Sequence, residues 1–269
     1  MRAALRPRWL IGHVIVILMI CGFVWAGFWQ VRRLSERNAE NARIEARTMA
    51  PVVPYDELVV EVTADPGDVE FRRVEITGTY TDGEVLIRGR SLNQTNGYLV
   101  VTPLVSDSAT VLVARGWVPF AMGNGAPRPL AAAAPPSGEV TVVGYLRQSE
   151  TRGLLGGNDP VDGVLDEMNR IDVARIDEQT AGELAPMWIQ LQSQVPEGGE
   201  YPAVIPPPKP KDGNHLSYAF QWFSFAVVAA VAWPLIVSRS VRKRRSRPAS
   251  AERPDAPGAP DSIDAPTGA

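Results

Sequence analysis

The side chains with the widest chemical range in this sequence are its two histidines, His13 and His215. Residues 30–214 contain no histidine and no cysteine, which excludes Ser-His-Asp and Cys-His catalysis there, and also metal sites ligated by His or Cys. The single cysteine, Cys21, has no partner within the chain, so paired-thiol copper carriage and thiol redox chemistry are excluded too. The chemistry that remains is that of a single imidazole beside an apolar segment.

His215 begins a group of side chains at three- and four-residue spacing, which is the spacing of one helix face. The group consists of His215, Tyr218, Trp222 and Phe225. An imidazole above flat aromatic rings suits a haem group, because neutral imidazole is a common axial ligand of haem iron. The alternative is an interfacial belt, since Tyr and Trp gather at membrane–water boundaries and a histidine can simply cap a helix.

A second polar group ends the first apolar segment and comprises Trp29, Gln30, Arg32 and Arg33. Guanidinium groups suit carboxylates such as haem propionates, and a glutamine amide can hydrogen-bond between helices or to a ligand. Arginines at this position can equally bind lipid phosphates. These residues are therefore candidates for haem contact, with an ordinary membrane interface as the alternative.

The two histidines belong to different ends of their segments. His13 precedes Trp29 by sixteen residues, which is roughly 24 Å of helix. If the second segment runs antiparallel to the first, His215 lies level with Trp29 and not with His13. The two imidazoles are therefore not expected to ligate one iron within a monomer.

Two apolar runs, residues 10–29 and 218–237, must position these side chains. Each is about 20 residues long, or about 30 Å of helix, which matches a bilayer core. No small-residue cleavage site follows the first run, so we interpret it as a retained anchor and not as a signal peptide. A basic cluster follows the second run, and basic residues favour the cytoplasmic side. We therefore expect a cytoplasmic N-terminus (1–9), a transmembrane helix (10–29), an extracytoplasmic domain (30–214), an antiparallel transmembrane helix (215–238) and a basic, then disordered, cytoplasmic tail (239–269).

The region between the helices is predicted to be β-rich, which makes the fold class a membrane protein of α+β type. A charged, Ala-rich stretch over 34–49 extends the first helix, and residues 171–183 predict a short helix. Residues 123–138 and 153–163 read as loops, and 197–212 as a Pro-rich connector. The spacing favours an antiparallel sheet or a partly closed barrel. Runs rich in Val, Ile, Thr and Tyr predict strands over 71–80, 84–90, 97–104, 109–118, 139–148 and 187–192.

The net charge and the remaining motifs argue against several classes of partner, ligand and activity. The net charge of −3 gives no reason to expect a nucleic-acid partner. The acidic residues of one Gly-rich loop match no calcium-loop template, so a solvated loop is the preferred interpretation; they are Asp159, Asp162, Asp166 and Glu167. The glycines of 153–157 lack the ending of a phosphate-binding loop. We therefore expect no catalytic residues and no enzyme.

Several motifs, in order along the chain, resemble the surfeit locus 1 family of cytochrome c oxidase assembly factors. The resemblance covers about residues 8–238. It rests on six segments: Gly27 to Arg33, Arg73-Val74 before Gly78-Thr79-Tyr80, Gly97-Tyr98 before Val101 to Leu104, Val111 to Pro119, Gly144 to Arg147, and His215 to Phe223. One departure is Ala114, where many relatives carry Asn before Arg-Gly-Trp.

The resemblance implies a non-enzymatic protein of a bacterial plasma membrane that helps to deliver haem a to oxidase subunit I, beside haem A synthase. It makes His215 the candidate ligand of the haem iron, with haem a held only transiently between the two helices and covered by Trp222 and Phe225. A partner-binding edge is expected at Arg115, Gly116 and Trp117. For that edge the alternative is internal packing, with the glycine allowing close approach and the tryptophan filling the core.

Two other functions are weighed against haem delivery. A membrane scaffold would hold an oxidase assembly intermediate without binding haem, with His215 as an interface residue only. A membrane enzyme acting on haem is disfavoured, because such catalysis usually needs more than one axial ligand and the segments offer no histidine pair.

Overall fold

A computed structural model describes residues 7–151, 157–209 and 215–245 of the chain. The chain divides into two compact units. One contains the first part of the N-terminal helix, up to Ser35, together with the C-terminal helix; the other runs from Glu36 to Asp212. The expected loop over 153–163 lies partly, and the tail after Arg245 wholly, outside the described residues.

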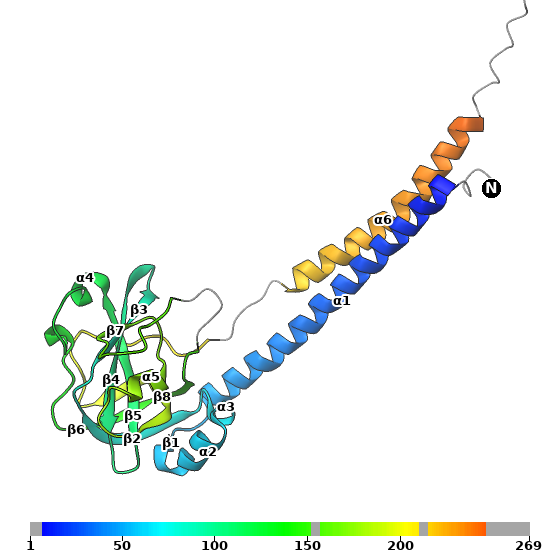
Figure 1. Ribbon diagram of the computed structural model, residues 1–269. Coiled ribbons are helices and arrows are strands. Elements are labelled where there is room, and N and C mark those ends of the chain that lie inside the picture. Colours follow the sequence, from blue (N-terminus) through cyan, green and yellow to red (C-terminus); the bar gives the residue numbers. More distant parts are fainter. Residues whose placement is uncertain (1–6, 152–156, 210–214, 246–269) are drawn as a thin grey trace, which may run out of the picture. The chain divides into compact units, whose positions relative to one another are not determined.

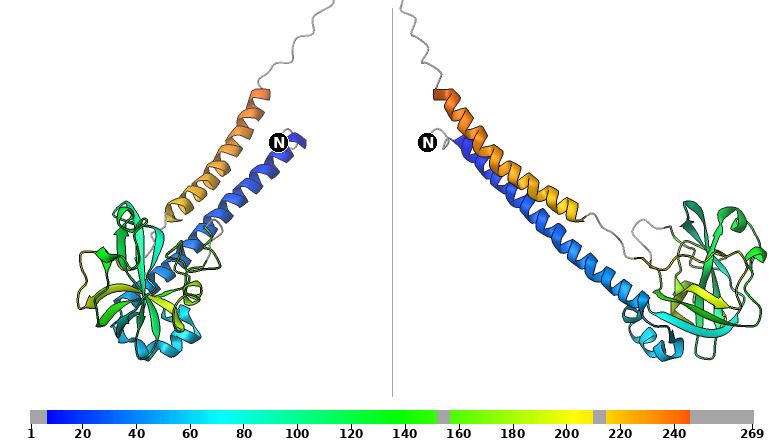
Figure 2. Two further views of the ribbon diagram at one scale, coloured as in Figure 1. Left: turned by 60° about the vertical axis from the view of Figure 1, so that its left-hand side comes forward. Right: turned by 180° about the vertical axis from the view of Figure 1, so that it is seen from behind.

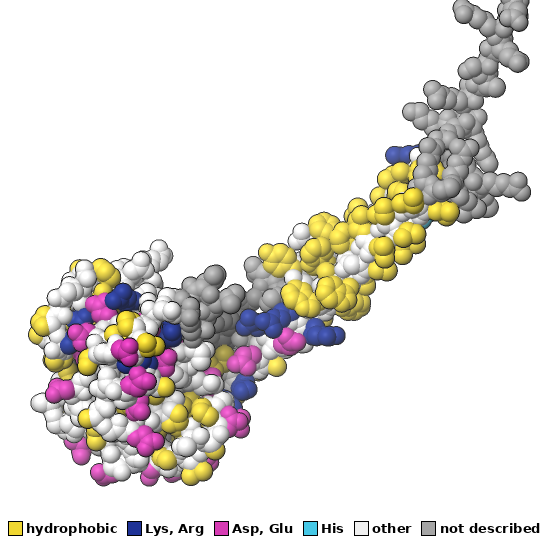
Figure 3. Space-filling model, in the orientation of Figure 1, with side chains coloured by type: hydrophobic (Ala, Val, Ile, Leu, Met, Phe, Trp, Pro, Cys, Tyr) yellow, Lys and Arg dark blue, Asp and Glu magenta, His cyan; other side chains and the backbone are white. Residues whose placement is uncertain are grey.

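The helix pair consists of α1 (Pro7–Met49) and α6 (His215–Arg245), which run side by side and antiparallel (Figures 1 and 2). Both are long and apolar enough to cross a membrane. Their apolar side chains are mostly exposed, as Figure 3 shows, and not packed inside protein. An exposed apolar surface of this length is stable only in lipid, which supports the expected membrane protein.

Helix α1 continues without a break past the apolar segment, so the helix predicted over 34–49 is confirmed as an extension of the first one. Ile44 is buried, and the Arg47 guanidinium donates to the carbonyl oxygens of Gly67 and Glu70 at 2.8 and 3.1 Å. The last turns of α1 are thereby fixed to the β-rich domain. Pro51 follows one residue after the end of the helix, where it prevents continuation.

The domain is built on one sheet whose strands close into a ring. Five strands follow one another around it, and β2 returns to pair with the end of β4 through Thr79 and Tyr80. Strands β3 and β7 continue the sheet beyond β4, and β1 adds to β2. The strands are β1 (Val53–Pro54), β2 (Arg73–Tyr80), β3 (Val85–Leu92), β4 (Thr95–Val105), β5 (Thr110–Pro119), β6 (Glu139–Gln148), β7 (Glu167–Met168) and β8 (Leu184–Val195).

The ring agrees with a partly closed barrel, but the sheet is mixed and not simply antiparallel. Strands β5 and β8 pair in parallel, from Thr110 with Leu184 to Ala114 with Gln190. The two-residue strands β1 and β7 are also parallel to their partners. The fold class is therefore α+β with a mixed sheet. The long crossover after β6 returns β8 to the ring between β5 and β6, antiparallel to β6 and parallel to β5.

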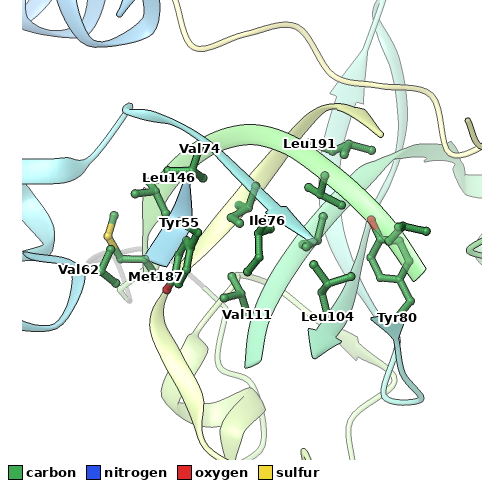
Figure 4. Close-up of a cluster of buried hydrophobic side chains, with 14 of the residues drawn as sticks. Tyr55, Val62, Val74, Ile76, Tyr80, Leu104, Val111, Leu146, Met187 and Leu191 are labelled. Carbon is green, nitrogen blue, oxygen red and sulfur yellow. The ribbon is translucent and has the colours of Figure 1, made fainter. Parts of the chain in front are cut away.

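Alternating side chains fill the barrel. Strand β2 buries every second residue, namely Val74, Ile76, Gly78 and Tyr80, and exposes the residues between them. Figure 4 shows these side chains meeting Leu104, Val111, Leu146, Met187 and Leu191 from the other strands, with Tyr55 and Val62 closing one end. The closing residues come from η2 (Tyr55–Leu58) and α2 (Val59–Ala64), which precede α3 (Pro66–Val69).

Two predictions about the second half of the domain need correction. The helix expected over 171–183 is only α5 (Val173–Asp177), because Gly182 takes a φ of +94° and the Leu184 N–H bonds the Asp177 carboxylate to start β8. The last strand is consequently twelve residues long, not six. The loop after β5 contains two short helical turns, α4 (Phe120–Gly123) and η3 (Ala131–Ala133).

The barrel has an open seam that the connector to α6 fills. Strands β5 and β8 stop pairing after Ala114 and Gln190. Beyond that point Trp117 exchanges two backbone hydrogen bonds with Ala203, at 2.7 and 2.8 Å, as an isolated bridge. The Gln190 side chain also donates to the Pro206 carbonyl at 2.7 Å. Part of the predicted connector is thus built into the domain.

Candidate functional site

Helix α6 packs against α1 through small and aromatic residues. Ala219 and Ala226 are buried and lie seven residues apart, the repeat of a helix–helix seam. Opposite them, Gly27 is buried beneath the Phe223 ring, and a Cβ on it would lie 2.6 Å from that ring. Gly27 therefore sets how closely the two helices approach, as small residues do in membrane helix pairs.

The predicted haem-covering residues Trp222 and Phe225 are used in this packing. Both rings lie against Phe23 of α1, with centroid distances of 5.8 and 5.7 Å, and against each other at 6.0 Å. Phe28 and Phe223 form a further edge-to-face pair at 5.4 Å. The space between the helices at this level is filled by these side chains, so the predicted role of Trp222 and Phe225 in covering a haem stays a prediction.

His13 occupies the other end of the pair. Its Nδ1 accepts a 2.7 Å hydrogen bond from the Trp233 indole N–H, and the two rings meet edge to face. Trp9 packs on the same indole. Because Nδ1 accepts, the proton of a neutral His13 ring resides on Nε2. A protonated Nε2 offers no lone pair to a metal, which favours a packing role for His13.

The helix offset determines the level of His215. Phe223 lies level with Gly27, and His215 begins α6 eight residues earlier, about 12 Å further along. The contacts of Phe223 with Gly27 and of Trp222 with Phe23 place the matching position on α1 between Gln30 and Ser35, at or just beyond the predicted level of Trp29. The histidines are far apart, as predicted. The His215 side chain itself lies outside the described part of the structure.

The remaining predicted haem contacts are placed on the outer surface of the pair. Tyr218 and Trp29 are each 51% exposed, and Arg32 and Arg33 are exposed as well. Gln30 is half-buried on α1. Tyr218 lies in the first turn of α6 and the others lie at residues 29–33 of α1, but the structure does not gather them around one cavity within the described residues of the helix pair.

The predicted partner edge is an internal site. Arg115 is 2% exposed; its guanidinium forms a 2.6 Å ion pair with Glu84 and donates to the Thr102 hydroxyl and the Ala133 carbonyl. Burial lowers the pKa of the Arg115 guanidinium, an effect that Glu84 opposes. Glu84 also accepts from the Leu130 N–H. The pair therefore fixes the loop after β5 to the barrel.

Gly116 and Trp117 also make their contacts inside the domain. A Cβ on Gly116 would lie 2.5 Å from the Ala203 carbonyl oxygen, and the Trp117 indole N–H donates to the Arg90 carbonyl at 2.9 Å. Trp117 is 7% exposed. These contacts favour the internal-packing alternative for Arg115, Gly116 and Trp117, because none of the three presents a side chain to a partner.

The acidic loop is neutralised by protein groups. Glu167 pairs with Arg88 and Arg128 at 3.0 and 3.1 Å, and Asp159 accepts from the Asn169 backbone and side chain. Within residues 7–151, 157–209 and 215–245, no cluster of His, Cys, Asp and Glu has the geometry of a metal site.

Sequence reasoning missed one cluster, in which the Arg147 guanidinium lies between the Phe71 and Trp188 rings at 5.0 and 5.3 Å. In the sequence, Arg147 stands out only as the last residue of the motif from Gly144 to Arg147. A positive φ at Phe71 creates this contact, and no local signal in the sequence indicates it.

Comparison with known proteins gives one consistent result. Residues 17–227 match the model of the SURF1 family. The chain is 31% identical to an uncharacterised SURF1-like protein of Mycobacterium tuberculosis over 258 residues, covering 94% of this chain and 92% of that protein. A SURF1-like protein of Rickettsia bellii is 26% identical over 239 residues, which cover 85% and 91% of the two chains. One from Drosophila melanogaster is 28% identical over 234 residues, or 77% and 71%.

Proposed function

Because this chain belongs to the SURF1 family, we propose that it is an assembly factor for haem–copper cytochrome c oxidase that helps to deliver haem a to subunit I. The match covers both apolar helices and the domain between them, so the proposal concerns the protein as a whole. Haem a is cargo here, held transiently, and no catalytic step is assigned. Subunit I and haem A synthase are the proposed partners in the bilayer.

The observation that carries the haem assignment is the hydrogen bond between His13 and Trp233. The chain has only two histidines. Since His13 is occupied within the helix pair, His215 is the imidazole left to bind haem iron. A single protein ligand suits a carrier, because the iron must leave it for the sites of the oxidase.

The packing supports a position for the cargo at the end of the helix pair. The tight contact of Gly27 with Phe223 leaves no room at its own level. Beyond it, Tyr218 lies one turn from His215 and is half exposed, and Arg32 and Arg33 follow on α1. We assign Tyr218 to contact with the macrocycle and the arginines to the propionates. Trp222 and Phe225 would then stabilise the helix pair by packing on Phe23, further along α6 from the proposed haem position.

The proposed orientation follows from charge. Arg239 and Arg242 continue α6 after its apolar segment, and the remaining basic residues follow directly. Basic residues favour the cytoplasmic side. We therefore propose that both termini are cytoplasmic and that the domain from Glu36 to Asp212 faces outward, where a haem bound near His215 would sit in the outer leaflet.

The test is an optical spectrum of the full-length protein, purified after co-expression with the enzymes of haem A synthesis. We expect a haem a Soret band for the wild type and for His13→Ala, and its loss in His215→Ala. The two variants remove the same side chain from opposite ends of one helix pair, so they form a matched set. Equal haem content in both would refute the ligand assignment.

The scaffold alternative is favoured by one observation, the use of Trp222 and Phe225 in packing against Phe23. If no variant and no wild-type sample contains haem, while oxidase assembly in cells still requires the protein, the scaffold function replaces haem delivery. If His215→Ala then also impairs assembly, the histidine is a contact residue for the partner.

A further inference from the structure

A cavity of about 320 Å³ lies within the domain unit, where the last turns of α1 meet the barrel. Three chain segments contribute to it: α1, the turn before β2 with the strand β6 beside it, and the connector before α6. Its lining residues are Arg37, Glu40, Asn41, Ile44, Phe71, Arg147, Pro208 and Lys209.

The cavity is cationic. Arg37, Arg147 and Lys209 line it, against one carboxylate, Glu40. Neither Arg37 nor Lys209 forms an ion pair with another described residue. Two positive side chains without a partner, converging on one hollow, attract an anion and cost little to reorient toward it.

Arg147 is the fixed member of the set. Its guanidinium lies between the Phe71 and Trp188 rings, and it donates to the Gln190 side chain at 2.9 Å. Its guanidinium forms a long ion pair with Glu70, at 3.7 Å, and its buried Nε–H has no hydrogen-bond partner among the described residues. A planar guanidinium held in this way, with donor capacity left, is suited to phosphate oxygens.

Phe71 gives an independent indication of a ligand site. It adopts a φ of +68°, which is an outlier for a bulky side chain. The conformation is imposed by backbone hydrogen bonds on both sides, from the Phe71 N–H to the Leu146 carbonyl and from the Leu146 N–H to the Arg72 carbonyl. Strain of this kind concentrates at ligand sites, and here it turns the ring over Arg147 at the cavity wall.

Both chain connections to the apolar helices line the cavity. Arg37 follows Trp29, the last aromatic residue of the first apolar run, by eight residues in the same helix. Lys209 precedes the start of α6 by six residues. Long basic side chains near the end of a membrane helix reach the interfacial region, where the lipid phosphates lie.

We propose that this cavity binds the phosphate of an anionic phospholipid headgroup, with Arg147 as the fixed ligand and Arg37 and Lys209 closing over it. The inference goes beyond haem delivery and does not depend on it. Such a site would add a lipid contact to the two chain connections that tie the domain to the apolar helices.

The test uses the full-length protein in uncharged maltoside micelles, titrated calorimetrically with short-chain phosphatidylglycerol and, separately, phosphatidylcholine. We expect saturable binding of phosphatidylglycerol at least about tenfold tighter than of phosphatidylcholine. The double substitution Arg37→Gln with Lys209→Gln, which changes no packed side chain, should weaken it about tenfold. Arg147→Lys keeps the charge but loses the fork of donors, so it should weaken binding as well.

Arg43→Gln is the control, because Arg43 is exposed on the same helix and does not line the cavity. Its affinity should stay within about twofold of the wild type. Equal binding of the two lipids, or an equal loss in Arg43→Gln and the double variant, would overturn the proposal. Inorganic phosphate binding as tightly as phosphatidylglycerol would also overturn it, because the site would then serve a soluble anion.

Discussion

The indole N–H of Trp233 donates to Nδ1 of His13 across the helix pair, at 2.7 Å, and this bond joins the first turns of α1 to α6. Within the helix pair as described, it is a polar contact in an otherwise apolar seam. Such bonds between membrane helices are worth about 0.6 kcal/mol on average.

Trp233→Phe should therefore lower the stability of the helix pair by about 0.5–1 kcal/mol, because it removes the donor and keeps most of the ring. Unfolding in mixed micelles, followed by circular dichroism at increasing fractions of a denaturing detergent, measures the change. Trp25→Phe is the control, since Trp25 is 70% exposed on α1. Equal midpoints for the two variants would mean that the bond contributes nothing.

Gly27 should tolerate no larger residue. In Gly27→Ala the new methyl group would meet the Phe223 ring at 2.6 Å, so the helices must separate or the ring must turn. We expect a loss of about 1–3 kcal/mol, the usual cost of overpacking. Gly22→Ala, where nothing lies within 4 Å of the new atom, should be neutral or slightly stabilising. The same detergent titration compares them, and a neutral Gly27→Ala would contradict the close approach.

The ion pair of Glu84 and Arg115 should be essential to the domain. Glu84→Gln leaves a buried guanidinium without its counter-charge, which costs about 3–5 kcal/mol. The loop after β5 should become protease-sensitive as well, because Glu84 also holds the Leu130 N–H. Asp82→Asn, two residues away and exposed, should change neither the thermal midpoint nor the cleavage pattern. A stable Glu84→Gln domain would show that the pair is dispensable.

Tyr55 should make the domain sensitive to alkaline pH. Burial raises the pKa of its phenol to about 12, against about 10 in an unfolded chain. Between these values the unfolded state loses the proton while the folded state keeps it. The contribution is fully present below pH 10 and declines by about 2–3 kcal/mol as the pH rises to 12.

Tyr55→Phe should remove this part of the pH dependence. Urea unfolding of both proteins at pH 8 gives the cost of the substitution itself, and the same measurement at pH 11 gives the ionisation effect. The variant should lose less stability than the wild type between the two pH values. If both proteins lose the same free energy of unfolding between pH 8 and pH 11, the pH dependence arises at another group. Tyr80 is one such group, because burial also raises its pKa.

Local patterns predicted much of the fold. The β6 strand over 139–148 and the end of α1 at Met49 were obtained from sequence because alternation, turn residues and prolines define them locally. The two-residue strands β1 and β7 and the parallel pairing of β5 with β8 depend on segments far away in the chain. Alternation of apolar residues predicts a strand but does not indicate which other strand pairs with it in the sheet.

The candidate site was predicted less completely. Spacing identified the aromatic face of α6, but the level of His215 depends on the offset between two helices, which Gly27 and Phe223 determine together. Internal packing was an alternative for Arg115, but its ion pair could not be predicted, since its counter-charge, Glu84, lies 31 residues earlier. The Arg147 cluster combines residues from three distant segments and a backbone conformation that is rare for phenylalanine.

The bridge between Trp117 and Ala203 has a consequence for how the protein is made. A chain grows from its N-terminus, so the seam between β5 and β8 remains open until the connector has been synthesised and has bonded at Ala203 and Pro206. Pro206 precedes α6 by only nine residues. The barrel is therefore completed at almost the same moment as the second helix begins, and insertion of that helix and closure of the domain become a single late step of biogenesis.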